Sequence, residues 1–232
     1  MKSTALVSCI MPTKATRRHF LPLAVKCFLS QDYPNLELLI LDDNDDSCAP
    51  VYLPADARIR YERVSSNGLS TGSKRNEACS SAKGDIIVHM DDDDWYAGDW
   101  VSRQVALLET TGALICGLNK LLFYEPLQQK AWIYTYVLDN RPWVAGATMA
   151  YRRTYWEKNR FRDMWVGEDN EFIWHCKDRY ATLDYMEGFV SIIHPGNTSG
   201  KDTIGRSWTA YPVETVAGIL KEQDNIYHKD FF

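Results

Sequence analysis

The sequence predicts an α/β fold with a mostly parallel central sheet flanked by helices, in a single domain over residues 1–232. Short apolar runs with the length of buried strands alternate with segments of helical spacing through the first hundred residues. One of these runs leads directly into four consecutive aspartates, and no linker, repeat or low-complexity segment interrupts the chain. Because strands that alternate with helices form right-handed βαβ units, this order favours parallel strand pairing.

The first half of the chain has the clearest pattern. Pro22 is tolerated in the first turn of a helix, Ser70 and Thr71 can cap the next helix, and Gly84 can end it. The predicted strands are Ala5–Met11, Leu36–Leu41, Ile59–Val64 and Asp85–Met90, and the predicted helices are Phe20–Ser30 and Ser70–Ala82.

Aromatic residues mark the second half, because all eight tryptophans lie at Trp95 or later. We expect a nucleotide-type half over about 1–98, an aromatic, substrate-type half over about 99–200, and a tail or lid over about 201–232. The predicted helices here are Asp99–Thr110, Glu168–Arg179 and Pro212–Gln223, and the predicted strands are Ala113–Tyr124, Ala131–Leu138, Val144–Tyr151, Thr182–Tyr185 and Phe189–His194.

Composition excludes several classes of protein. The 26 basic and 31 acidic side chains give a net charge of −5, which argues against a general nucleic-acid binder. No stretch has the roughly 20 apolar residues of a membrane span, and the N-terminus does not resemble a signal peptide, which leaves peripheral membrane contact and oligomeric state open. The six cysteines lie at least 18 positions apart, which is typical of buried, reduced thiols and indicates a cytoplasmic protein.

The acidic run Asp91-Asp92-Asp93-Asp94 follows a predicted buried strand. Neighbouring carboxylates repel one another when they are partly desolvated, and a divalent cation bridged to a phosphate ligand relieves that repulsion. Oxygen ligands suit Mg²⁺ or Mn²⁺, and ligands of open α/β sheets bind at the carboxyl ends of strands. The alternative is a solvated acidic turn that caps the next helix.

Other polar positions each allow two interpretations. Asp43 could accept a hydrogen bond from a nucleotide base or belong to an ordinary Asx turn. Lys74 and Arg75 could receive an anion at a helix N-terminus or lie on a capped surface helix. Asp169 could be a general base or a favourable partner of a helix dipole, and His194 could be a ligand or structural.

Together these segments resemble a family 2 glycosyltransferase of the GT-A fold, from about Leu6 to His194. The resemblance depends on the order and spacing of Val7–Thr13, Phe28–Asp43, Lys74–Ala78, Lys83–Asp85, Met90–Asp94 and Gly167–Asp169.

The resemblance implies a metal-dependent, inverting transferase that moves a sugar from a UDP- or dTDP-sugar donor to a carbohydrate or glycoconjugate acceptor, in glycan or cell-surface polysaccharide biosynthesis. Asp169 would be the catalytic base, and Asp93 with His194 would hold Mn²⁺ or Mg²⁺. The implied nucleotide-sugar-binding residues are Thr13, Asp43, Arg75, Asp91 and Asp92.

Departures from the family pattern limit what the resemblance implies. Lys14 stands where relatives often carry an aromatic residue, and the Q-x-x-R-W motif of processive synthases is missing, so one sugar per encounter is expected. A sugar-phosphate nucleotidyltransferase would need a glycine-rich loop after the first strand, and a non-catalytic binding module remains a third interpretation. Trp95, Trp143 and Trp165 are candidates for stacking on a sugar ring.

Overall fold

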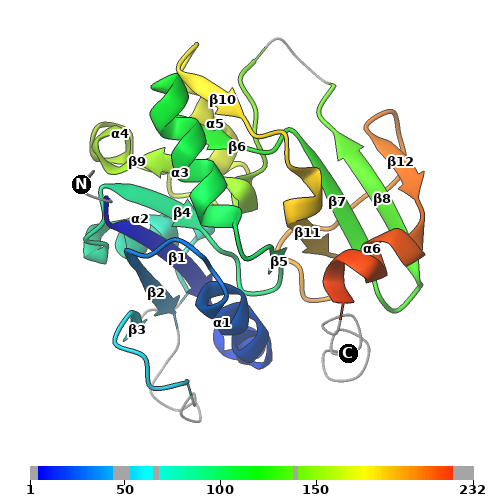
Figure 1. The fold of residues 1–232 in the computed structure, drawn as a ribbon, viewed down its shortest axis with the longest axis horizontal. Coiled ribbons are helices and arrows are strands. Elements are labelled where there is room, and N and C mark those ends of the chain that lie inside the picture. The colour runs from blue at the N-terminus through cyan, green and yellow to red at the C-terminus, as the bar shows by residue number, and fades with distance from the viewer. Residues whose placement is uncertain (1–4, 44–52, 65–67, 138–140, 222–232) are drawn as a thin grey trace.

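The computed structural model describes residues 5–43, 53–64, 68–137 and 141–221. A seven-stranded sheet forms the larger half, in the order β10-β6-β9-β4-β1-β2-β3 (Figure 1). Its strands are β1 (Val7–Thr13), β2 (Leu36–Asp42), β3 (Ile59–Arg63), β4 (Ile86–His89), β6 (Ile115–Gly117), β9 (Ala150–Arg152) and β10 (Tyr180–Thr182).

The predicted α/β class is confirmed, in a mixed form. Strands β1, β2, β3 and β4 pair in parallel, whereas β9 runs antiparallel to both β4 and β6. Strand β9 follows the short turn η2 (Gly146–Thr148), and not a helix, in the chain.

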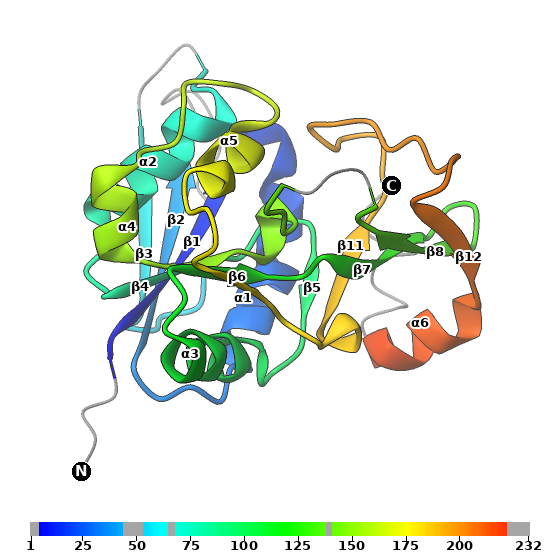
Figure 2. The same cartoon turned by 90° about the horizontal axis from the view of Figure 1, so that it is seen from above.

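Helices cover both faces of this sheet (Figure 2). On one face α1 (Leu21–Leu29) and α3 (Trp100–Thr111) pack against alternate residues of β1, namely Val7, Cys9 and Met11. On the other face Ile10 packs with α2 (Thr71–Ser81), α4 (Arg153–Lys158) and α5 (Glu168–Trp174). The period of two in a strand thus separates the two cores.

Helix α2 begins and ends close to the predicted positions. The Ser70 side chain accepts a hydrogen bond from the Ser73 amide at 3.1 Å, which satisfies one of the donors that an N-terminus leaves open. Helix α5 is shorter than predicted and ends at Trp174. Sequence analysis missed α4 and the short 3₁₀ helix η1 (Ala15–Phe20) that precedes α1.

A second, five-stranded sheet was not predicted. It has the order β12-β8-β7-β11-β5. Figures 1 and 2 both show it beside the first sheet. Its strands are β5 (Trp95–Tyr96), β7 (Lys120–Glu125), β8 (Lys130–Thr135), β11 (Phe189–Ile192) and β12 (Trp208–Tyr211), with α6 (Val213–Leu220) packed against it.

Two of the predicted strands each cover two separate elements, and the strand expected near Thr182–Tyr185 is β10, which ends at Thr182. The single strand expected over Ala113–Tyr124 is β6 and β7, which belong to different sheets. The strand expected over Val144–Tyr151 is the turn η2 followed by β9. In both cases the chain leaves one apolar environment for another, so continuous hydrophobicity conceals the break.

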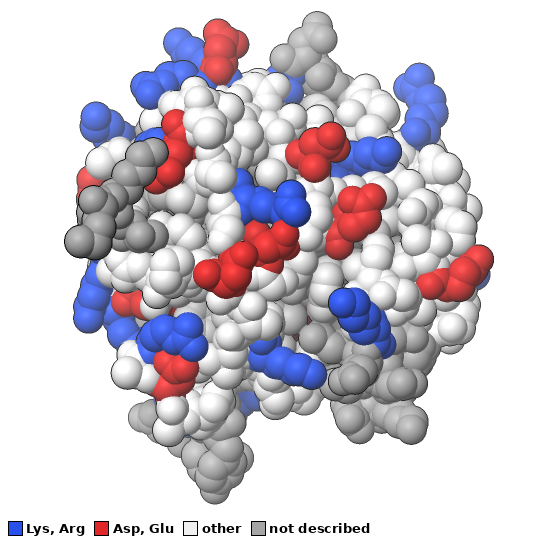
Figure 3. Space-filling view, viewed as in Figure 1, with Lys and Arg blue, Asp and Glu red and all other residues white. Residues whose placement is uncertain are grey.

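The cysteines, the lengths of the helices and the surface charges can also be located in the structure. Among the described residues, Cys9, Cys27, Cys79, Cys116 and Cys176 are buried free thiols, and Cys48 lies outside them. No helix in these ranges is long and apolar enough to cross a bilayer. On the face shown in Figure 3 basic and acidic side chains are interspersed, and neither sign forms a continuous field.

Candidate active site

The carboxyl ends of β1, β2 and β4 open onto one cavity of about 900 Å³, because parallel strands end at the same edge of a sheet. The second sheet forms the opposite wall through β7, β8 and β12. The predicted site residues Thr13, Asp43, Arg75, Asp91, Asp92, Asp93 and Asp169 all line this cavity. His194 lies behind its lining and contacts Asp93.

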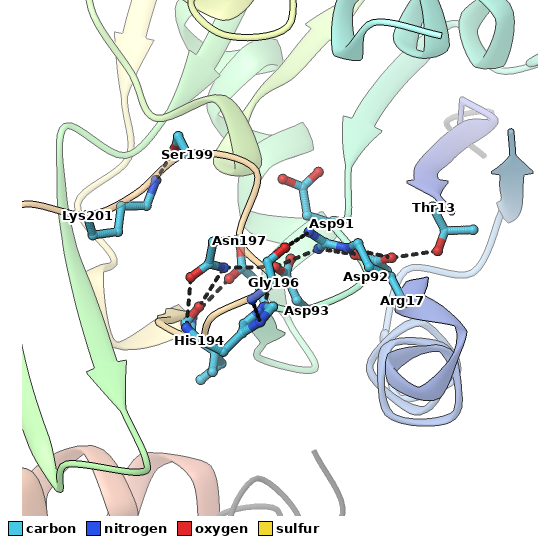
Figure 4. Close-up of polar contacts among 12 residues, drawn as sticks. Thr13, Arg17, Asp91, Asp92, Asp93, His194, Gly196, Asn197, Ser199 and Lys201 are labelled. Carbon is cyan, nitrogen blue, oxygen red and sulfur yellow. Dashed lines mark hydrogen bonds and ion pairs between the residues drawn. The ribbon is translucent and has the colours of Figure 1, made fainter. Parts of the chain in front are cut away.

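Asp92, Asp93 and Asp94 of the acidic run are buried, and an arginine pairs with the first two of them. Arg17, on η1, donates from Nε to Asp92 Oδ1 at 3.0 Å and from Nη2 to Asp92, and its Nη2 lies 2.6 Å from Asp93 Oδ2. The Thr13 hydroxyl, at the end of β1, donates to Asp92 Oδ2 at 2.6 Å. Figure 4 shows these contacts, with the Asp91 carboxylate pointing away from them.

A turn after β11 completes the shell around Asp93. His194 Nε2 lies 2.9 Å from Asp93 Oδ2, and the Asn197 side-chain amide donates to the same oxygen at 3.1 Å. The Gly196 amide donates to His194 Nδ1 at 3.1 Å, which leaves Nε2 as the ring nitrogen that faces Asp93. Asp93 therefore joins the two sheets.

Burial and charge act differently on Asp92, Asp93 and Asp94. Burial raises the pKa of Asp92 despite the neighbouring Arg17 charge. Burial also opposes ionisation of Asp93, but the His194 hydrogen bond and the Arg17 charge outweigh it and lower its pKa. Burial, with the charges of Asp93 and Asp91, raises the pKa of Asp94 well above its usual range. The Arg17 pKa is raised, since the Asp92 and Asp93 charges outweigh its own desolvation.

The interpretation as a solvated acidic turn is therefore wrong for Asp92, Asp93 and Asp94, whose exposed fractions are 3%, 7% and 5%. A cation of the protein itself, Arg17, already offsets the repulsion between Asp92 and Asp93. Sequence analysis expected a divalent ion in that role and did not identify Arg17.

Asp43 has one oxygen satisfied and one open. Its Oδ2 lies 2.7 Å from Lys74 Nζ and accepts from the Leu69 amide at 3.2 Å. Its buried Oδ1 has no hydrogen-bond partner among the described residues. An ionised carboxylate oxygen left without a donor is costly, so this atom is suited to a ligand N–H.

Arg75 is buried between two acidic motifs. Its Nη1 donates to Glu168, its Nη2 lies 3.9 Å from Asp91 Oδ2, and its guanidinium lies 5.7 Å from the centre of the Phe161 ring. The charges of Glu168, Asp91 and Asp169 outweigh desolvation and raise the Arg75 pKa. The arrangement connects the acidic run to the start of α5.

Asp169 lies in the first turn of α5, against the turn η2. Its Oδ1 accepts from the Asn170 amide at 2.8 Å. Gly146 leaves the space for the carboxylate, since a Cβ there would come within 3.0 Å of Asp169 Cβ and Cγ and closer to Oδ2. The side chain is half-buried and faces the cavity.

Aromatic rings form the wall that belongs to the second sheet. Tyr136 stacks on Trp143 at 4.7 Å between ring centres, and Tyr134 contacts both Trp143 and Trp208. Trp208 lies 4.7 Å from Phe123. Trp143 lines the cavity, Trp165 lies at its rim with 59% of its surface exposed, and Trp95 packs between two hydrophobic cores instead.

The donor atoms near Asp93 fit a divalent cation. Its carboxylate and the His194 imidazole lie 2.9 Å apart, and Asp91 offers a second carboxylate to the cavity. No group of three or more histidine, cysteine, aspartate or glutamate side chains suited to a metal occurs within the described ranges.

The fold and the cavity define an α/β protein of the GT-A type, with acidic side chains at the carboxyl edge of its sheet. The chain belongs to glycosyl transferase family 2, which it matches over residues 8–170. The family and the fold predicted by resemblance are thus confirmed.

Individual relatives are similar to parts of the chain. It is 34% identical over 113 residues to WcaA of Escherichia coli K12, which is named as a colanic acid biosynthesis glycosyl transferase. The matched segment covers 46% of this chain and 38% of WcaA. It is 29% identical over 130 residues to the E. coli UDP-Glc:alpha-D-GlcNAc-diphosphoundecaprenol beta-1,3-glucosyltransferase WfaP, covering 55% and 49%. The chain thus spans less than half the length of these curated relatives.

Two solved structures show the same fold. S. aureus TarS 1–349 in complex with UDP-GlcNAc superposes with a TM-score of 0.61 at 15% identity, covering 83% of this chain and 60% of that one. The mannosyltransferase PcManGT from Pyrobaculum calidifontis, in complex with GDP-Man and Mn²⁺, gives 0.57 at 17% identity, covering 83% and 57%.

Sequence reasoning missed Arg17, Glu168 and Asn197. The segment Thr13–Arg18 follows the first strand and contains no glycine, and this was the only use made of it. A basic residue at this place lies near an acidic strand end, which requires a counter-ion. Asn197 follows the turn residues Pro195 and Gly196, and only the return of β11 to the sheet edge brings it to Asp93.

Proposed function

We propose that this protein is a metal-dependent, inverting glycosyltransferase. It moves one sugar from a UDP- or dTDP-sugar to an acceptor hydroxyl during assembly of a cell-surface glycan. The observation that carries the proposal is that the buried aspartates and the half-buried Asp169 face one cavity. Membership of glycosyl transferase family 2 supports the reaction class, and relatives named for UDP-sugars support the donor.

The donor nucleotide would bind at the ends of β1 and β2. Asp43 Oδ1, which has no hydrogen-bond partner among the described residues, would accept the N3–H of the pyrimidine, and Thr13 would line the base pocket. Uracil and thymine both carry this N–H, so the same contact serves a UDP- or a dTDP-sugar.

Asp93 and His194 would hold the cation, with Asp91 directed to the donor's ribose or sugar. A bound Mn²⁺ or Mg²⁺ would stabilise the negative charge that develops on the departing nucleoside diphosphate. His194 and Asn197, on the turn after β11, hold the Asp93 carboxylate in place, which preorganises the site.

Asp169 would remove the proton from the acceptor hydroxyl. As the acceptor oxygen forms its bond to the anomeric carbon, the bond from that carbon to the diphosphate oxygen breaks, and the proton passes to Asp169. A single displacement of this kind inverts the configuration of the carbon. The aromatic wall of Phe123, Tyr134, Trp143 and Trp208 offers apolar faces on which the acceptor's sugar rings can stack.

A screen of UDP-, dTDP- and GDP-sugars tests the proposal, with thermal stabilisation and nucleotide release measured with and without Mn²⁺. We expect UDP- or dTDP-sugars to stabilise the protein and to release nucleotide when acceptor is present. Asp169→Asn should keep the stabilisation and lose about 10²-fold or more of the release. The exposed Asp178 provides a control, since Asp178→Asn should behave as wild type.

Two outcomes would contradict the proposal. If no nucleotide sugar stabilises the protein, the donor assignment is wrong. If Asp169→Asn binds donor and releases nucleotide at the wild-type rate, Asp169 is not the base. Binding of donor by the wild type without any transfer would instead favour a non-catalytic binding module.

A further inference from the structure

Arg17 occupies a central place in the cavity, although no motif pointed to it. Its side chain is 11% exposed and reaches three partners: Asp92, Asp93 and, at 3.4 Å from Nη1, the Gly196 carbonyl. Gly196 belongs to the same turn as His194 and Asn197. One guanidinium therefore ties the acidic run of the first sheet to the turn after β11.

The atom that Arg17 contacts on Asp93 is the one next to His194. Nη2 of Arg17 lies 2.6 Å from Asp93 Oδ2, and His194 Nε2 lies 2.9 Å from that same oxygen. With the Asn197 amide at 3.1 Å, this oxygen already has three donors around it. A cation that binds Asp93 through Oδ2 must therefore replace one of them, and Arg17 brings a permanent positive charge to that oxygen.

We propose that Arg17 is a displaceable counter-cation that competes with the divalent ion for Asp93. In the donor-free protein it neutralises Asp92 and Asp93. When the ion binds together with the nucleoside diphosphate, Nη2 leaves Asp93 and the guanidinium turns to the diphosphate, where arginine forms strong charge-assisted hydrogen bonds. The inference rests on the divalent-cation requirement in the proposed function.

Three features support displacement rather than a permanent ion pair. Arg17 lines the same cavity as the aspartates, so a ligand can reach it. It comes from a short 3₁₀ helix with no side-chain cap, where a long side chain can change rotamer without moving β1. Its attachment to Asp92 also remains through Nε, so releasing Asp93 does not require releasing both acids.

The proposal predicts opposite effects of one substitution on two ligands. For Arg17→Gln without nucleotide, we expect Mn²⁺ to bind about tenfold tighter or more, because a charge-assisted contact no longer competes and the Asp92–Asp93 repulsion favours a cation. With saturating Mn²⁺, we expect the same variant to bind UDP about tenfold or more weakly, because the diphosphate loses a guanidinium. Binding of uridine, which has no phosphate, should not change.

Calorimetric titration with Mn²⁺ alone, then with UDP and with uridine, measures these effects independently of catalysis. Arg18→Gln is a matched control, because Arg18 is the next residue, pairs with Asp42 and does not line the cavity; it should leave Mn²⁺ affinity unchanged. Arg17→Lys keeps the charge but loses the planar fork, so its Mn²⁺ affinity should fall between those of wild type and Arg17→Gln. It also serves if the glutamine variant does not fold.

Unchanged or weaker Mn²⁺ binding by Arg17→Gln, or by Arg17→Lys if only that variant folds, would overturn the proposal and make Arg17 a purely structural partner of the aspartates. The proposed transferase function would survive that result, provided that wild type binds Mn²⁺ and loses that binding in Asp93→Ala. If neither wild type nor variant binds Mn²⁺, the competition and the metal requirement are both refuted, while metal-independent UDP binding would keep the donor assignment.

Discussion

The Asp169 carboxylate occupies the space that Gly146 leaves by having no side chain. A Cβ at position 146 would lie within 3.0 Å of both Asp169 Cβ and Cγ. The Gly146 carbonyl is in turn held by His89, whose Nδ1 lies 2.6 Å from it. The position of the candidate base is therefore set by a turn that precedes β9 and by a histidine at the end of β4.

Gly146→Ala should reduce turnover with little loss of donor binding. The added methyl group overlaps Asp169, and a displacement of about 1 Å at a catalytic group can cost about 10²-fold in rate. We expect kcat to fall by that order while UDP affinity stays within a factor of two to three, measured by steady-state kinetics and calorimetry. Gly218→Ala, in α6 with open space around the site, is the control, and wild-type kcat in Gly146→Ala would contradict the packing argument.

Asp43→Ala should weaken binding of the base rather than of the phosphates. The substitution removes the buried Oδ1, which has no partner in the described structure, and a hydrogen bond to a charged group is worth about 1.5–3 kcal/mol. Uridine and UDP should therefore lose affinity by the same factor, about 10- to 100-fold. A loss seen only with UDP would place Asp43 at the diphosphate instead, through its contact with Lys74.

Removal of the divalent ion should abolish tight donor binding. We expect a chelator, or Asp93→Ala, to lower UDP affinity by about tenfold or more, because the diphosphate loses its charge partner. Calorimetric titration of UDP with and without chelator measures this. Unchanged UDP affinity in the presence of chelator would count against metal dependence and would leave Arg17 and Lys74 as the cations at the site.

Trp143→Ala should impair the acceptor and spare the donor. Trp143 lines the cavity on the side of the second sheet and stacks on Tyr136, away from the base and diphosphate contacts. We expect the acceptor KM to rise several-fold, since an aromatic contact is worth about 0.5–1.5 kcal/mol, with donor KM unchanged. Trp95→Phe, at a tryptophan outside the cavity, is the comparison, and an equal rise in both KM values would contradict the assignment.

Acid should destabilise the fold through His89. Burial and the charge of Arg75 hold the His89 pKa well below its usual range, so the unfolded chain binds this proton more readily than the native one. The free energy of unfolding therefore keeps this contribution at pH values above the histidine pKa of the unfolded chain, near 6.5. Below that pH it decreases by up to about 1.4 kcal/mol per pH unit. In urea unfolding at several pH values, His89→Asn should lose this component of the slope, whereas His175→Asn, at an exposed histidine, should not. Parallel curves for wild type and His89→Asn would contradict it.

Much of the first half could be predicted from local sequence alone. The apolar runs match β1, β2 and β4 to within a few residues, and the cap at Ser70 marks the start of α2. The acids that follow β4 were also expected at the carboxyl end of their strand, where ligands of open α/β sheets bind. Periodicity and capping are local properties, so a single sequence reveals them.

Contacts between distant segments were decided only by the tertiary structure. No local pattern shows that Arg17 lies on Asp92, 75 residues away, that His194 and Asn197 return to Asp93, or that Ala113–Tyr124 divides between two sheets. Such contacts depend on how the second sheet packs beside the first. That packing is determined by many buried interactions between distant segments, and neighbouring residues in the sequence do not reveal it. The chain by itself determined which acids stand at the strand ends, and folding decided that an arginine of the protein would neutralise them.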